Sequence, residues 1–211
     1  MSKLLIDALV QRFGDAVVET HSQFGDETAV IDPASWFEAA RFLKTDPRCL
    51  MNQFIDLTAV DYPDREPRFE VVLHLRSLER GHRLRLKSRI GDAYGDGAEI
   101  DSVMAVWGGA NWFEREAFDM FGVVFRGHPD LRRILMYPEF KGYPLRKDYA
   151  ANQIQPLIPF RKEALVDKLP PFGPDEGMSF GRQTHEFHRD DPLMVAARDK
   201  KSKQLIAKEK G

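Results

Sequence analysis

The sequence predicts an α+β fold: a mixed, mostly antiparallel sheet with helices on one side, followed by an extended, irregular C-terminal arm. Strand-like stretches, in which apolar and polar residues alternate, follow one another across short turns. Helix-like stretches precede and interrupt these strands without following each one in turn, so a doubly wound nucleotide-binding fold is not favoured. After residue 136 prolines recur and the apolar pattern ends, which predicts the arm.

The first third of the chain predicts a helix, a hairpin and a second helix. Apolar residues at helical spacing predict a helix over 4–13. Alternating residues predict strands over 16–24 and 28–32, with a Gly-Asp turn between them. A second helix is expected from Pro33 to about residue 46, because proline is tolerated in a first helical turn.

Three further strands are expected in the middle of the chain, over 54–62, 69–78 and 83–90. The last alternates strictly and places four basic residues on one face. That face is either a solvated sheet surface or a surface for an acidic protein partner. Residues 91–97 have the wrong glycine spacing for a phosphate-binding loop and are interpreted as a plain loop. Residues 100–107 are expected to form a helix.

A short aromatic helix is expected next, from Asn111 to Gly122. Asn111 is a capping residue, and Glu114 is placed to reach back to it in a capping box. Arg115 and Asp119 are spaced to form an ion pair along one face. Gly122 supplies a left-handed helix end.

The segment that follows the helix is expected to form a short strand over 123–125 and a turn over 127–130. His128 is interpreted as a turn residue whose imidazole binds backbone, with a role in proton transfer as the alternative. Arg132 and Arg133 are able to bind carboxylates with two hydrogen bonds each, and an acidic neighbouring protein is their expected target.

The helix carries more aromatic surface than one apolar stripe can bury, in Trp112, Phe113, Phe118 and Phe121. One interpretation is a helix wedged between the sheet and a loop. The other is that the helix and its loop also face a partner protein, since aromatic residues and arginine are enriched at the centres of interfaces.

Two segments resemble a known family. The run EREAFDMFGVVFRGHPDLRRIL over 114–135 resembles the signature of the 30 kDa-type subunit family (the C subunits) of NADH-quinone oxidoreductase, respiratory complex I. The run YPLRKDY over 143–149 is similar to a second element of that family. The resemblance implies that the signature residues form a partner interface: Trp112, Glu114, Arg115, Glu116, Asp119, Phe121, His128, Asp130, Arg132, Arg133, Arg146, Lys147 and Asp148.

The same resemblance implies a non-catalytic structural subunit of the peripheral arm. No catalytic residue, cofactor or metal is then expected in this chain, since FMN, iron–sulfur clusters and quinone would lie in partner subunits. The implied partners are chiefly the D subunit, which is related to hydrogenase large subunits, and the cluster-bearing B and I subunits. The implied location is the cytoplasmic side of the bacterial inner membrane (the matrix side in mitochondria), reached only through the complex.

The composition agrees with these expectations. The formal net charge of the 211 residues is −2, so a strongly basic nucleic-acid footprint is absent. A single cysteine, Cys49, cannot form an intrachain disulfide or a four-thiolate cluster site. No run approaches the roughly 20 apolar residues of a membrane span, and the N-terminal residues lack the pattern of a signal or transit peptide.

The expected organisation is a compact α+β domain over 1–136 and a Pro-rich arm over 137–211 that docks on partner subunits. Two alternatives remain open. One is the equivalent subunit of a related membrane-bound hydrogenase or a ferredoxin- or F420-type dehydrogenase. The other is a stand-alone hydrolase or metal-dependent enzyme that uses His128, His185 and a pair of glutamates, with His185, Glu186 and His188 as the candidate metal ligands.

Overall fold

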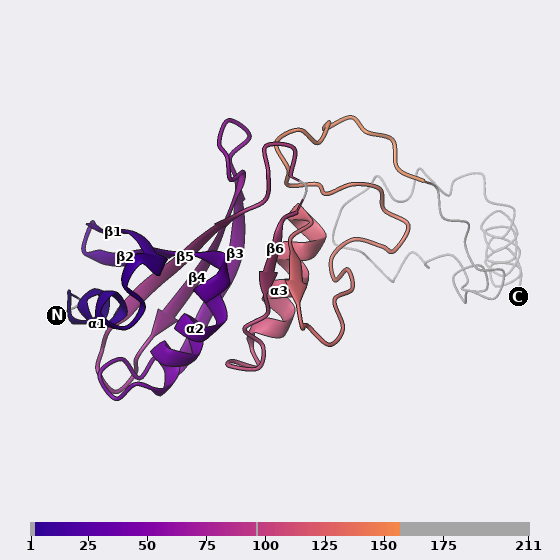
Figure 1. Cartoon of the computed structure of the whole chain (residues 1–211). Coiled ribbons are helices and arrows are strands. Elements are labelled where there is room, and N and C mark those ends of the chain that lie inside the picture. The colour runs from indigo at the N-terminus through magenta and orange to yellow at the C-terminus, as the bar shows by residue number, and fades with distance from the viewer. Residues whose placement is uncertain (1–2, 96, 157–211) are drawn as a thin grey trace, which may run out of the picture. The chain divides into compact units, whose positions relative to one another are not determined.

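The computed structural model describes residues 3–95 and 97–156 (Figure 1). Its centre is a five-stranded sheet with the strand order β1-β2-β5-β4-β3. β2 and β5 run parallel, and the other three neighbouring pairs are antiparallel, which confirms the predicted mixed, mostly antiparallel sheet. The strands are β1 (Val17–Gln23), β2 (Asp26–Ile31), β3 (Gln53–Asp61), β4 (Phe69–Arg76) and β5 (Arg83–Ile90).

The α-helices of the described residues are α1 (Lys3–Phe13), α2 (Trp36–Thr45) and α3 (Ala110–Phe121). A 3-10 turn over Pro33–Ser35 leads into α2, and the Asp32 side chain accepts a hydrogen bond of 3.0 Å from the Ala34 N–H there. The predicted helices over 4–13 and 33–46 are therefore confirmed to within a few residues.

All three helices pack into one core with one face of the sheet. Leu9 of α1, Trp36 of α2 and Ala117 of α3 belong to the same buried cluster as Val71 and Leu73 of β4. The side chains at i and i+2 of a strand share a face, so this cluster marks the covered face of the sheet. Burial of each large apolar side chain contributes about 1.5–3 kcal/mol.

The opposite face of the sheet carries charged side chains that neutralise one another. Lys87 of β5 lies 2.6 Å from Glu70 of β4, and Arg89 lies 2.7 Å from Glu19 of β1 and 3.4 Å from Glu70. The basic face predicted for residues 83–90 thus finds its acidic partners within the sheet. This arrangement favours the solvated-face interpretation over an acidic protein partner.

The helix predicted over 100–107 is wrong. Residues Glu99–Asp101 form strand β6, which pairs in parallel with β7 (Val124–Arg126), and turns follow it. The apolar residues of this stretch are buried in the core, but they lie on a strand and on the turns that follow it. Ile100 lies opposite Phe125 in the two-stranded sheet. A strand partner 25 residues away in sequence decides the conformation, and local periodicity does not reveal it.

Residues 137–156, the described part of the predicted arm, contain no helix or strand and pack against the domain. For example, the Leu145 N–H donates to the Met120 carbonyl of α3 over 3.1 Å. Residues 157–211 lie outside the described residues. The domain boundary at residue 136 and the docking of the arm on partners stay predictions.

Candidate functional site

Helix α3 begins differently from the expectation. Its N-terminal cap is Gly109, which offers no side-chain cap, so the predicted cap at Asn111 is wrong. The predicted capping box is also wrong, because Glu114 turns inward. Its carboxylate accepts hydrogen bonds from Ser102 Oγ at 2.6 Å and from the Val103 N–H at 2.8 Å. Glu114 therefore connects α3 to the loop that follows β6.

Glu114 is a fully buried acid. Burial raises its pKa to about 7, although the hydrogen bonds from Ser102 and Val103 act in the opposite direction. Its contacts are polar but uncharged, so burial outweighs them. The buried Glu114 side chain presents no surface to a partner.

Asp119 is the second buried acid of α3, and it organises the loop after β7. Its carboxylate pairs with Arg133 Nη1 at 2.7 Å and accepts the N–H groups of Ile134, Leu135 and Met136 at 3.1, 2.8 and 2.8 Å. Burial alone would raise the pKa of Asp119, but the three N–H groups and the guanidinium outweigh burial and lower it.

Two predicted pairings around Asp119 are corrected by these contacts. The expected pair between Arg115 and Asp119 is absent, because Asp119 turns into the protein. Arg115 donates to the carbonyls of Arg132 and Arg133 at 3.1 and 3.3 Å. The carboxylate that Arg133 binds is Asp119 of the same chain and not one from a neighbouring protein.

His128 fixes the turn at the other end of the loop. The Asp130 N–H donates to His128 Nδ1 at 3.1 Å, so Nε2 carries the hydrogen and donates to the Asn111 carbonyl at 3.3 Å. The expectation that the imidazole binds backbone is confirmed. Through His128 and Arg115, the loop is held along α3.

A segment over 143–149, here called the strap, crosses the end of α3. Arg146 Nε donates to the Phe121 carbonyl at 2.6 Å, the Lys147 N–H donates to Asp61 Oδ2 at 2.7 Å, and Asp148 pairs with Arg68 at 3.0 Å. The side chains of Arg146 and Asp148, predicted at a partner interface, therefore bind within the chain.

Gly122 is required where the strap crosses α3. It ends the helix with φ +80°, as predicted. A Cβ atom at Gly122 would lie 2.5 Å from Tyr143 Cε2 and 2.6 Å from Arg146 Nη2, so a side chain cannot fit without displacing the strap. The glycine is needed both for its backbone conformation and for this close approach.

Sequence reasoning missed Asp61 and Arg68, which hold the strap from the sheet side. Arg68 Nε and Nη2 bind the two Asp61 oxygens at 2.7 and 2.9 Å, and both side chains are almost fully buried. A signal was present in the sequence: Asp61 continues the buried series of Leu57 and Ala59 at a spacing of two. An acid at a core-facing strand position implies a buried partner.

The aromatic residues of α3 divide between the two interpretations. Phe113 packs on Phe54 and Phe118 on Tyr143, with ring centroids 5.2 and 6.3 Å apart, and Phe121 is buried. These three agree with a helix wedged between the sheet and a loop. Trp112 is 66% exposed.

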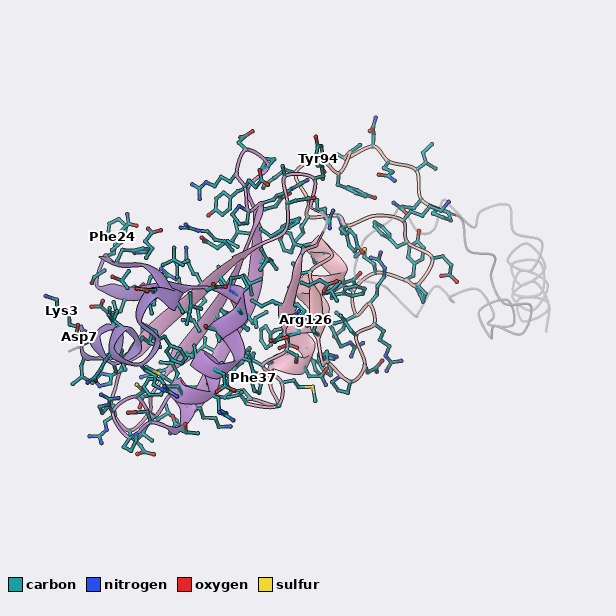
Figure 2. The ribbon with its side chains drawn as sticks, in the orientation of Figure 1. Lys3, Asp7, Phe24, Phe37, Tyr94 and Arg126 are labelled. Atoms are coloured by element: carbon teal, nitrogen blue, oxygen red, sulfur yellow. The ribbon has the colours of Figure 1, made fainter. Side chains whose placement is uncertain are left out.

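Trp112 and the other exposed signature residues of α3 and of the loop after β7 are here called the docking face. Glu116 is exposed on α3, and Asp130, Arg132 and Leu135 are exposed on the loop that Arg115 and His128 hold beside the helix. Figure 2 shows side chains projecting from α3 and from the loop after it. Of the predicted interface residues, Glu114, Asp119 and Phe121 are buried and offer no such surface. The interface role of the others stays a prediction.

The described residues contain no group of three His, Cys, Asp or Glu side chains placed to hold a metal ion. His185, Glu186 and His188, the metal ligands considered from sequence, lie outside the described residues. None of the described helices is long and apolar enough to cross a membrane.

Fold and surface together define a class of protein. It is an α+β domain in which buried carboxylates and arginines brace a loop beside α3, and it exposes Trp112 and Arg132, two residue types that are enriched at protein–protein interfaces. Residues 29–155 match the family model described as "Respiratory-chain NADH dehydrogenase, 30 Kd subunit". The chain belongs to this family of 30 kDa subunits of the respiratory-chain NADH dehydrogenase.

The chain is also similar to individual C subunits of NADH-quinone oxidoreductases. The chain is 42% identical over 165 residues to a C subunit (C 2) of the NADH-quinone oxidoreductase of Rhizobium etli, covering 78% of this chain and 80% of that protein. It is 43% identical over 145 residues to the C subunit of a Methylobacterium species and 51% identical over 126 residues to that of Caulobacter vibrioides. These two matches cover 69% and 60% of this chain, and 66% and 62% of the relatives.

A solved structure is also similar. It is a chain in the structure of the membrane-bound sulfane sulfur reductase, described as an archaeal respiratory membrane complex. The TM-score is 0.59 at 26% sequence identity, over 71% of this chain and 86% of that one.

Proposed function

We propose that this chain is a structural, non-catalytic subunit of the peripheral arm of a proton-translocating NADH:quinone oxidoreductase, in its quinone module. One observation carries the proposal. The family-signature charges Glu114, Asp119, Arg133 and Arg146 bind within the chain and brace its surface loops, while Trp112 of α3 stays exposed. The signature therefore supplies a preorganised docking face, and preorganisation lowers the entropy cost of association.

The proposal includes partners and location. The docking face binds chiefly the D subunit, which is related to hydrogenase large subunits, with the cluster-bearing B and I subunits close by. FMN, iron–sulfur clusters and quinone lie in those and other partner subunits, and this chain holds their geometry. It associates with the bacterial inner membrane on the cytoplasmic side, through the complex.

A related assembly is the second candidate. The similar chain from the archaeal sulfane sulfur reductase supports a place in a membrane-bound respiratory complex of another kind, such as a hydrogenase or a ferredoxin- or F420-dependent dehydrogenase. The relatives named for NADH-quinone oxidoreductase are 42–51% identical, against 26% for the sulfur-reducing complex. These identities favour the NADH-linked complex.

Affinity purification of the full chain from native membranes in a mild detergent tests the proposal, with mass spectrometry of the co-purifying proteins. An untagged strain is the control. We expect flavin- and cluster-bearing NADH dehydrogenase subunits to co-purify in fixed ratio to the chain. A set of nickel hydrogenase subunits would support the second candidate. A chain recovered alone, from the soluble fraction and with bound metal, would contradict both.

A further inference from the structure

Arg68 joins three separate parts of the chain. Its guanidinium binds both oxygens of Asp61 at the end of β3, pairs with Asp148 of the strap at 3.0 Å, and lies 3.4 Å from the Tyr94 carbonyl in the loop after β5. The Arg68 side chain is only 4% exposed. Asp61 contributes a second link, because it also accepts the Lys147 N–H. The strap is thus tied to the sheet at two adjacent residues.

The strap then contacts the residues that shape the loop beside α3. The Tyr143 ring lies 5.3 Å from the Arg133 guanidinium, and Arg133 Nη2 donates to the Gly142 carbonyl at 3.0 Å. Within the strap, the Arg146 guanidinium lies 4.6 Å from the Tyr143 ring centre and 5.0 Å from that of Phe69. Arg133 is therefore held by the strap on one side and by Asp119 on the other.

Asp119 completes a continuous series of direct contacts. It fixes the N–H groups of residues 134–136, including Leu135 of the docking face. The series runs from Arg68 through Asp148, the strap and Arg133 to Asp119 and the loop. We propose that Arg68 is a positioning residue for the docking face, which it orients through the strap although it lies far from that face in sequence. This inference rests on the proposed function, because it names what orients the same surface.

Arginine suits this role and lysine does not. A guanidinium presents five N–H donors in a planar fork, so it binds both Asp61 oxygens in parallel and still has donors directed at Asp148 and Tyr94. A lysine ammonium keeps the charge but loses the two-point geometry. Arg68→Lys is therefore expected to retain the fold and to loosen the strap.

Amide hydrogen exchange of the full chain, followed by mass spectrometry, tests the inference without any partner. Asp148→Asn removes only the strap end of the Arg68 network and leaves the pair between Arg68 and Asp61. We expect exchange at residues 134–136 and 145–149 to accelerate roughly fivefold, as for loss of one partly exposed ion pair. Exchange in β4 and β5 should stay unchanged. Arg68→Lys should accelerate the same two segments.

Arg89→Gln is the matched control, because Arg89 also bridges two carboxylates, Glu19 and Glu70, but on the open face of the sheet. It should leave exchange at 134–136 unchanged. Unchanged exchange at 134–136 in Asp148→Asn would overturn the inference, and so would equal acceleration across β4 and β5. Purification from membranes reports separately on the proposed function, so the two can fail independently.

Discussion

Asp119 and Arg133 lie 14 residues apart in sequence and form an ion pair of 2.7 Å, in which the Asp119 side chain is fully buried and that of Arg133 is 17% exposed. Asp119 also accepts three consecutive backbone N–H groups. A carboxylate that accepts several donors in this way fixes the conformation of the loop, because three consecutive backbone N–H groups are directed at one side chain.

Replacement of Asp119 by Asn is expected to lower the free energy of unfolding by about 3 kcal/mol at neutral pH, since it leaves Arg133 without a carboxylate. The pKa of Asp119 is lowered in the fold, despite burial, by the N–H groups and Arg133. Its contribution is therefore present above the ordinary value of 3.8 and is lost as the pH falls through the lower folded pKa. Urea unfolding of the parent and of Asp119→Asn at several pH values measures the loss of stability and its pH dependence. Equal stability of the variant and the parent at pH 7 would contradict the assignment.

Arg132 and Arg133 should differ in their effects on stability when each is changed to Glu. Arg133→Glu places a second carboxylate against buried Asp119, so we expect both lower stability and lower assembly into the complex. This replaces the view from sequence alone, in which Arg133 faces a partner directly. Arg132→Glu changes an exposed side chain, so the free energy of unfolding should stay within about 0.5 kcal/mol while assembly falls. Unfolding curves and the yield of assembled complex separate the two effects. Normal assembly of Arg132→Glu would argue against its place on the docking face.

Two glycines provide a matched test of strap packing. Gly122 and Gly127 both have φ +80°, but an added Cβ at Gly127 meets no atom within 4 Å, whereas at Gly122 it collides with Tyr143 and Arg146. Gly127→Ala should lower the free energy of unfolding by about 1 kcal/mol, from the backbone conformation alone. Gly122→Ala should lower it by about 1–3 kcal/mol more, because the added methyl group also overpacks the strap. Thermal unfolding gives the comparison, and equal costs would show that the strap does not pack on Gly122.

Because the pKa of Glu114 is raised, we expect the stability of the fold to depend on pH near neutrality. Burial raises its pKa from 4.5 to about 7, so its charged form is disfavoured in the fold. The associated stability is fully present below pH 4.5 and is lost as the pH rises through about 7, a total of about 3 kcal/mol. Glu114→Gln cannot ionise, and its stability should change less between pH 5 and 8 than that of the parent. Parallel pH profiles in urea unfolding would contradict this explanation.

Much of the fold was predictable because period-two alternation directly reports which face of a strand is buried. The five strands of the main sheet and the helix end at Gly122 follow from such local signals. Residues 99–107 do not, since β6 depends on pairing with β7, and the same apolar residues also fit a helix. Local propensity cannot choose between the two without knowledge of the partner strand.

The site was less predictable, because its pairings are non-local. Local rules pair Glu114 with a helix cap and Arg115 with Asp119, but the actual partners lie on other elements. The bond from the Lys147 N–H to Asp61 spans 86 residues. The sequence does identify which segments matter, and only the three-dimensional contacts show that many of their charges brace the surface from within.

The most direct test of the central claim is quantitative purification of the complex with Trp112→Ala, compared with Tyr94→Ala. Tyr94 is 83% exposed and lies in the loop after β5, which is not part of the docking face (Figure 2). Both variants should unfold like the parent, because each removes an exposed ring. We predict that Trp112→Ala lowers the ratio of co-purifying respiratory subunits at least tenfold, as for loss of an aromatic interface contact of about 1.4 kcal/mol or more. Tyr94→Ala should leave that ratio unchanged. Equal recovery of partner subunits with the two variants would contradict the docking face.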